Sequence, residues 1–154
     1  MCSSDLIMSD PVAERREMAE AMGATLVIDP ATHNLAKETQ ALTGGLGADA
    51  GFLTIGIASL VEQGLAAVRK EGYFNLFAGF PPGDRLEMEA NRIHYDEIFM
   101  TGTQNATTDH YVRVSQMLPH MPNAYKLITN RYRPDEANLA YEARLGLRSE
   151  RAHV

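Results

Sequence analysis

Residues 51–77 read GFLTIGIASLVEQGLAAVRKEGYFNLF, and this stretch decides the fold class. Residues 51–55 are mostly apolar and predict a buried strand that is closed by Gly56. Apolar residues or glycine then recur at i, i+3, i+4 and i+7, the spacing of one helix face, at Val61, Gly64, Leu65 and Val68. Gly72 is predicted to end this helix, and residues 73–77 predict the next strand. This order indicates a βαβ unit with parallel strands.

The same alternation continues on both sides of that unit. Strands are predicted at residues 6–8, 25–28 and 98–101, with a short edge strand at 86–88 and another strand at 127–129. Helices are predicted at residues 12–22 and 34–43, after an N-cap at Thr107 or Thr108, and after Pro134. The pattern predicts an α/β protein with a parallel sheet and helices on both faces.

The composition argues against several classes of function. The chain has 154 residues, 45% of them hydrophobic and 22% charged, which fits about one folded domain. Its net charge of -6, without a basic block, argues against binding to nucleic acid or anionic membranes. Cys2 is the only cysteine, so the sequence offers no internal disulfide, Cys-rich zinc site or CxxC pair. No membrane-length apolar run or signal-peptide pattern is seen, and we expect a cytoplasmic protein.

Both ends look foreign to the rest of the chain. Residues 1–6 contain Cys-Ser-Ser-Asp-Leu, the translation of a common sequencing-adapter end, and residues 148–154 resemble the complementary strand. We therefore expect both ends to be adapter-derived and the chain to be a piece of a longer parent. Ordinary polar termini are the alternative, and the codons of the nucleotide record decide between the two.

Asp10 is the most informative single residue, because it follows the first predicted strand. In a dinucleotide-binding sheet, an acid at such a strand end accepts hydrogen bonds from ribose hydroxyls and repels a 2′-phosphate. A helix N-cap is the alternative of equal weight, since Pro11 and a helix follow. Arg15 is expected on the first turn of that helix, where it could reach adenine or ribose or simply face solvent.

Small residues also follow three other predicted strands, at positions where open α/β sheets bind ligands. They are Thr54, Ile55 and Gly56; Phe77, Ala78 and Gly79; and Thr101, Gly102 and Thr103. Ordinary turn chemistry is the alternative at each of them. Residues 45–50 have G-x-G-x-x-A spacing, but this run follows a helix and precedes a strand, the reverse of a phosphate loop. We interpret it as a turn.

No residue is assigned a catalytic or metal-binding role. The five histidines form no HxH or HExxH pattern, so a zinc site within these residues is not expected. Ser59 and Ser115 have no base at a recognisable spacing, and the chain has no G-x-S-x-G motif.

From Ile7 to about Leu147 the chain resembles the medium-chain dehydrogenase/reductase superfamily, in its zinc-type alcohol, sorbitol and threonine dehydrogenase branch. The stretches that carry the resemblance are residues 8–11, 14–16, 22–24, 27–30, 43–49, 65–72, 77–79, 92–95, 100–102 and 128–132. The resemblance implies an incomplete Rossmann-type, doubly wound domain at residues 7–122, without its first strand and glycine loop. Residues 123–147 would return to a GroES-like catalytic domain that this sequence lacks.

The resemblance also implies an enzyme that transfers hydride from an alcohol carbon to NAD, with zinc bound in the absent N-terminal domain. Asp10 would bind the adenosine ribose of NAD, assisted by Arg15, and NADP would suit the site less. Residues 54–57 would line the adenine and ribose side, and residues 77–79 and 101–103 would lie near the nicotinamide. Arg131 would lie near the cofactor phosphates or the domain seam.

For the parent, the resemblance implies a small alcohol or polyol substrate and a dimer or tetramer, with no nucleic-acid or membrane partner. The chain alone is expected to be inactive and to bind NAD weakly at best. Two alternatives stay open, a zinc-free quinone-reductase-like enzyme of the same superfamily and a non-catalytic α/β binding domain. Asp10 argues mildly against the first alternative, which often uses NADPH.

Overall fold

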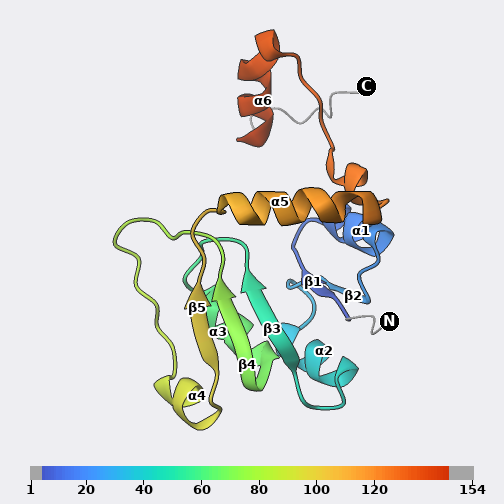
Figure 1. Cartoon of the computed structure of the whole chain (residues 1–154). Coiled ribbons are helices and arrows are strands. Elements are labelled where there is room, and N and C mark those ends of the chain that lie inside the picture. The colour runs from blue at the N-terminus through green and yellow to red at the C-terminus, as the bar shows by residue number, and fades with distance from the viewer. Residues whose placement is uncertain (1–4, 146–154) are drawn as a thin grey trace. The chain divides into compact units, whose positions relative to one another are not determined.

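The structure is a computed structural model that describes residues 5–145 (Figure 1). The chain divides between Ala106 and Thr107 into two compact units, and each is described by itself. Residues 1–4 and 148–154, which belong to the expected adapter-derived ends, lie outside the described residues.

The described strands of the first unit are all parallel and form two sheets. The smaller sheet pairs β1 (Ile7–Ser9) with β2 (Leu26–Ile28), and the larger has the order β3 (Ala48–Leu53), β4 (Val68–Leu76) and β5 (Phe99–Gly102). The helices of this unit are α1 (Ala13–Met22), α2 (Leu35–Leu42), α3 (Leu60–Ala67) and α4 (Ala90–Tyr95). The predicted α/β class, with parallel strands flanked by helices, is confirmed (Figure 1). The prediction of a single sheet is wrong, because the strands of residues 5–145 pair into two separate sheets.

Phe74 of β4 is the centre of the hydrophobic core and is 2% exposed. Its ring lies between Gly51 of β3 and Gly64 of α3. A Cβ added to Gly51 would approach the ring to 2.9 Å, and one added to Gly64 would approach it to 2.5 Å. Both glycines therefore make room for the ring, which explains an otherwise unfavourable glycine inside β3. The buried residues that form one packed cluster with Phe74 are Val61, Leu65, Val68 and Ile98.

The predicted end of the helix at Gly72 is wrong. Helix α3 ends at Ala67, and β4 begins at the next residue. Val68 is 3% exposed and is paired with Ala48 of β3, so burial and strand pairing end the helix before the glycine is reached. Gly72 lies within β4, where an added Cβ would come within 2.5 Å of the Val68 side chain.

Two predicted strands are also wrong. Residues 86–88 form no strand, because Leu86 and Met88 pack against the core, and their alternation reflects that packing. Residues 127–129 form no strand either, since Leu127 ends the 3-10 helix η2 (Ala124–Leu127). A strand needs a neighbour for its backbone groups, and the described part of the second unit contains no strand.

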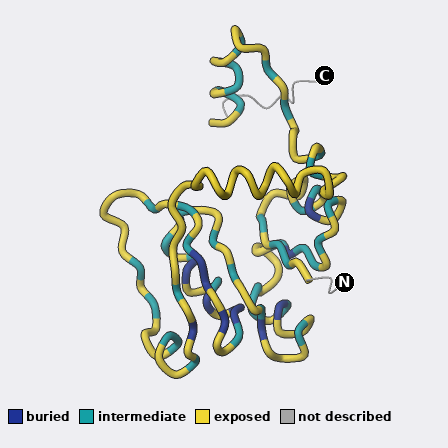
Figure 2. Tube along the Cα trace, in the orientation of Figure 1, coloured by how far each residue is buried: buried dark blue, intermediate teal, exposed yellow. Residues whose placement is uncertain are grey.

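The second unit contains helices α5 (Thr108–Met117) and α6 (Ala137–Arg144), with 3-10 turns η1 (Leu118–His120), η2 and η3 (Pro134–Glu136). Thr107 is the N-cap of α5, which confirms one of the two residues predicted for this role. Its hydroxyl accepts a hydrogen bond from the His110 amide, and the His110 ring accepts one from the Thr107 amide. None of the described residues of this unit is buried (Figure 2). No described helix of either unit is long and apolar enough to cross a membrane.

Asp96, directly after α4, is held by two cations. Its carboxylate forms ion pairs with Lys70 at 3.1 Å and with Arg92, and its side chain is 13% exposed. Arg92 also donates hydrogen bonds to the backbone carbonyls of Leu65 and Val68, where α3 gives way to β4. The hydrogen bond from Lys70 is the main cause that lowers the pKa of Asp96 from 3.8; desolvation opposes it, and the charge of Arg92 adds to it.

We expect the pKa of Asp96 to give the protein an acid-sensitive share of its stability. A carboxyl whose folded pKa lies below its unfolded value stabilises the fold above about 3.8, and the contribution is lost as pH falls through the folded pKa. Urea denaturation of wild type and Asp96→Asn should therefore show a stability difference at neutral pH that shrinks in acid. A difference that stays constant from neutral pH into acid would contradict this linkage.

Candidate functional site

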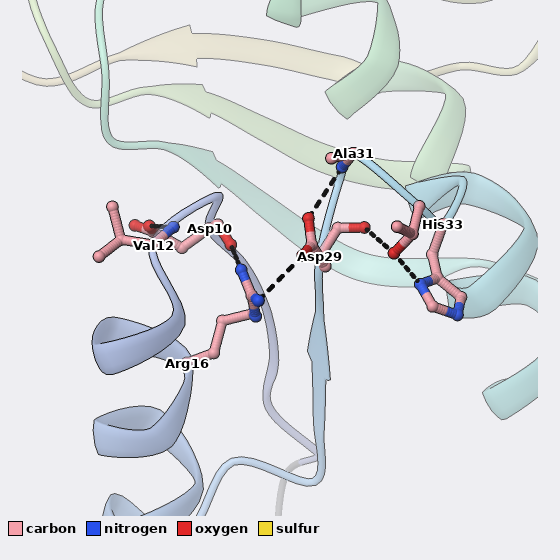
Figure 3. Close-up of polar contacts among 7 residues, drawn as sticks. Asp10, Val12, Arg16, Asp29, Ala31 and His33 are labelled. Atoms are coloured by element: carbon pink, nitrogen blue, oxygen red, sulfur yellow. Dashed lines mark hydrogen bonds and ion pairs between the residues drawn. The ribbon is translucent and has the colours of Figure 1, made fainter.

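Asp10 lies immediately after β1, and its backbone and carboxylate both contact other residues. Figure 3 shows its contacts with Val12 and Arg16. Its amide donates to the carbonyl of Ile28 at 3.2 Å, and its Oδ1 accepts from the amide of Val12 at 2.8 Å. The N-cap of α1 is Val12, so the alternative prediction that Asp10 caps this helix is wrong. Asp10 instead supports the turn before the helix. The side chain is 16% exposed, and among residues 5–145 Oδ2 pairs with Arg15 at 3.4 Å. One carboxylate oxygen therefore supports the turn, while the other keeps capacity to accept from a ligand.

Arg15 and Arg16 follow each other on the first turns of α1 but differ in their surroundings. The Arg15 side chain is 66% exposed, and its ion pair with Asp10 is long. The Arg16 side chain is only 18% exposed and is held by two acceptors. Its Nη1 donates to the carbonyl oxygen of Asp10 at 2.7 Å, and its Nη2 donates to Oδ2 of Asp29 at 2.9 Å (Figure 3).

Asp29 follows β2 as Asp10 follows β1, and each aspartate precedes a proline. Its Oδ1 accepts from the amide of Ala31 at 2.9 Å (Figure 3). Its carbonyl accepts from the amide of His33 at 2.9 Å. No site role for Arg16 or Asp29 is predicted from the sequence pattern. The repeated Asp-Pro pair after two neighbouring strands is the signal that could have indicated Asp29.

The other predicted site residues of the first unit gather where the strands of the larger sheet end. The amides of Phe77 and Ala78 both donate to the carbonyl of Leu53 at 3.1 Å, which joins the segments after β3 and β4. Gly56 lies so close to Gly79 that an added Cβ would be 1.9 Å from the Gly79 carbonyl oxygen. The predicted residues 54–56 and 77–79 are thus brought together.

The segment after β5 joins the same edge. The amide of Thr103 donates to the carbonyl of Leu76 at 3.3 Å, and its hydroxyl donates to Oδ1 of Asn75 at 3.1 Å. Thr101 and Gly102 form the end of β5 itself. Arg131, by contrast, belongs to the second unit.

The glycines of the glycine-rich run form a turn, as predicted, but residues 48–50 already belong to β3. Gly44, Gly45 and Gly47 lie between α2 and β3 and have φ values of 64°, 92° and 100°. A Cβ on Gly47 would also come within 2.9 Å of the Ala67 carbonyl oxygen. The run serves close backbone contact and does not open a helix, so it is not built to hold phosphate at a helix N-terminus.

The described residues fit the ribose of a dinucleotide better than its pyrophosphate. The Asp10 carboxylate, at a strand end with an oxygen available, suits the two hydroxyls of a ribose. No glycine-rich loop in residues 5–145 leads from a strand into a helix, so the described chain offers no matching cradle for a pyrophosphate. Across the same residues, no three His, Cys, Asp or Glu side chains cluster as metal ligands.

Comparison with known proteins shows the family. Residues 2–120 match the family model described as zinc-binding dehydrogenase. A protein named probable alcohol dehydrogenase, from a Pseudomonas species, is 39% identical over 79 residues, which cover 51% of this chain and 24% of that protein. L-threonine 3-dehydrogenase of Pyrococcus horikoshii is 37% identical over 76 residues, 49% of this chain and 22% of that one.

Solved structures show the same fold. An alcohol dehydrogenase from Thermotoga maritima superposes with a TM-score of 0.86 at 22% identity, over 94% of this chain and 41% of that one. A protein of Sinorhizobium meliloti, solved with NADP bound, gives a TM-score of 0.68 at 20% identity, over 85% of this chain and 43% of that one. The matched stretches span about a quarter of the two curated relatives. The family model matches residues 2–120, which is most of this chain, and the chain therefore belongs to the zinc-binding dehydrogenase family.

Proposed function

We propose that this chain is the cofactor-binding portion of an NAD-dependent alcohol or polyol dehydrogenase. Family membership supports an oxidoreductase as the parent protein. The observation that carries the proposal is the position of Asp10, an acid directly after β1 with one carboxylate oxygen still available. In dinucleotide-binding sheets, an acid at such a strand end binds the adenosine ribose.

In this proposal, Asp10 accepts hydrogen bonds from the ribose diol, and the exposed Arg15 guanidinium lies against the adenosine. Residues 54–56 line the adenine and ribose side, while residues 77–79 and 101–103 lie toward the nicotinamide. Their close backbone packing supports these roles, because it would hold the segments in fixed positions. Arg131 is proposed to approach the cofactor phosphates. NAD, when bound, would accept the hydride from the alcohol carbon.

The proposal includes a preference for NAD over NADP. A 2′-phosphate would replace the hydroxyl that Asp10 binds and would bring negative charge beside its carboxylate. The zinc expected in this family would be held by a part of the parent outside this sequence, so the chain by itself would not turn over alcohol. Assembly of the parent into a dimer or tetramer and a cytoplasmic location stay predictions from the sequence.

Replacing Asp10 with alanine should lower NAD affinity about tenfold or more, because a hydrogen bond to a charged group contributes roughly 1.5–3 kcal/mol. Isothermal titration calorimetry of the wild-type chain with NAD and with NADP measures both affinity and preference. We expect wild type to bind NAD more tightly than NADP, and Asp10→Ala to lose most of that difference.

Asp49→Ala is the matched control. Asp49 also pairs with an arginine, Arg69, at 2.6 Å. It lies near the amino end of β3, whereas the proposed site lies at the carboxyl ends of the strands. This variant should bind NAD as wild type does. NAD affinity that is unchanged by Asp10→Ala would remove Asp10 from the proposed role and with it the main support for the function.

A further inference from the structure

The Arg16 guanidinium joins the ends of β1 and β2. It donates to the backbone carbonyl of Asp10 with one nitrogen and to the carboxylate of Asp29 with another, at 2.7 and 2.9 Å. The two aspartates are separated by one helix and one strand in the sequence, so this bridge is a tertiary contact. Figure 3 shows Arg16 reaching from α1 across to both strand ends.

This bridge completes the fixation of the Asp10 backbone. The Asp10 amide is already bound to the carbonyl of Ile28 in β2, and Arg16 binds the Asp10 carbonyl. With both backbone polar groups held, the direction in which the Asp10 side chain leaves the strand is restricted. Asp29 is in turn restrained by the amide of Ala31, so the anchor of the bridge is itself fixed.

The Arg16 side chain is less free than that of Arg15 to contact a ligand. The described contacts of Arg16 are with protein acceptors, and its side chain is mostly buried. Because its guanidinium is bound to protein acceptors, Arg16 would affect a ligand by holding Asp10 in position. Arg15, with 66% of its side chain exposed, is the arginine that can contact a ligand directly.

We propose that Arg16, together with Asp29, is a positioning residue that aims the Asp10 carboxylate at a ribose diol. The inference rests on the proposed function, since it assumes that Asp10 binds the ribose. It adds that the preference for a ribose diol over a deoxyribose depends on the Arg16–Asp29 bridge as well as on the Asp10 carboxylate. Arginine is suited to this task because its planar, forked donors can serve two acceptors at once.

The test uses the wild-type chain and two adenine nucleotides, AMP and 2′-deoxy-AMP, with dissociation constants measured by ligand-observed NMR. They differ in one ribose hydroxyl, so their affinity ratio isolates the contact with the diol. Wild type should prefer AMP about tenfold, the discrimination that one hydrogen bond to a carboxylate supplies. Asp10→Ala should bring the ratio to about one, and Arg16→Met should bring it below about three, because the carboxylate is no longer aimed.

The ratio separates positioning from general stability. A variant that is only partly folded binds both nucleotides less and keeps the wild-type ratio, so an unchanged ratio in Arg16→Met overturns the inference. Arg16→Lys keeps the charge but cannot span both acceptors in the same geometry, and we expect it to lose discrimination as well. Asp29→Asn should lower the ratio, and adding it to Arg16→Met should cause little further loss, because both changes break one bridge.

Arg69→Met is the control, since it removes an arginine–aspartate pair at the start of β3 and should leave the ratio unchanged. The outcomes also separate this inference from the proposed function. If wild type binds both nucleotides with equal affinity, Asp10 is not a diol acceptor and both proposals fail. If wild type discriminates and Asp10→Ala does not, but the Arg16 and Asp29 variants keep the full ratio, only the positioning role is overturned.

Discussion

Replacing Phe74 with alanine is expected to lower the free energy of unfolding of this chain by about 3–5 kcal/mol, the usual cost of removing a buried aromatic ring. Phe74 is 2% exposed and lies at the centre of the core cluster. The two glycines that face its ring offer no side chains that could move into the space, so the cavity would stay largely open. Urea denaturation followed by far-UV circular dichroism measures the loss.

Gly64→Ala tests the same contact from the opposite side. Alanine is about 1 kcal/mol better than glycine inside a helix, so the substitution should stabilise α3 if nothing else changed. The added Cβ would approach two carbons of the Phe74 ring to 2.5 and 2.6 Å, and we therefore expect net destabilisation. Phe74→Leu removes those ring carbons, so the double variant should be more stable than the sum of the two single effects predicts.

Gln63→Ala is the control for helix propensity, because Gln63 is the exposed neighbour of Gly64 on α3. It should leave stability nearly unchanged. If Phe74→Ala does not fold, Phe74→Leu still provides the coupling measurement. Additive effects of Gly64→Ala and Phe74→Leu would show that the close packing of ring against glycine does not limit stability.

The alternation of strands and helices could be predicted from local pattern, because short apolar runs separated by turn signals mark strands. The expectation that both faces of the sheet are covered is wrong for β3 to β5, where Phe52, Tyr73 and Phe99 are exposed. The boundary between α3 and β4 could not. Gly72 looks like a helix end, but the chain changes from helix to strand between Ala67 and Val68 without a turn. That change is set by pairing with β3 and by burial of Val68, which are contacts with distant segments.

The same distinction applies to the candidate site. The place of Asp10 at a strand end follows from the sequence, since a strand pattern precedes it and a helix pattern follows it. Its geometry does not, because Arg16 and Asp29 meet only when β1 and β2 pair. Periodicity also misled where apolar residues pack without strand pairing, as with Leu86 and Met88. Local pattern therefore locates the elements, and pairing between them decides which polar groups meet.

Gly56→Ala is expected to force apart the segments that follow β3 and β4. The added Cβ would lie 1.9 Å from the carbonyl oxygen of Gly79 and 2.9 Å from its carbonyl carbon. Both are backbone atoms, so neither can rotate out of the way as a side chain could. We expect a loss of about 1–3 kcal/mol in stability, as for overpacked sites. If these segments line the cofactor as proposed, NAD affinity should also fall about tenfold, which corresponds to 1.4 kcal/mol.

Gly79→Ala provides a control within the same contact. A Cβ at Gly79 would meet no heavy atom within 4 Å, although the residue takes part in the same close approach. The two variants add the same methyl group to the two sides of one backbone contact, and only the Gly56 side is blocked. We therefore expect Gly79→Ala to keep the stability of wild type in denaturation. Equal losses of stability in both variants would mean that neither glycine tolerates a side chain. The close approach of Gly56 to the Gly79 carbonyl would then not explain the loss in Gly56→Ala.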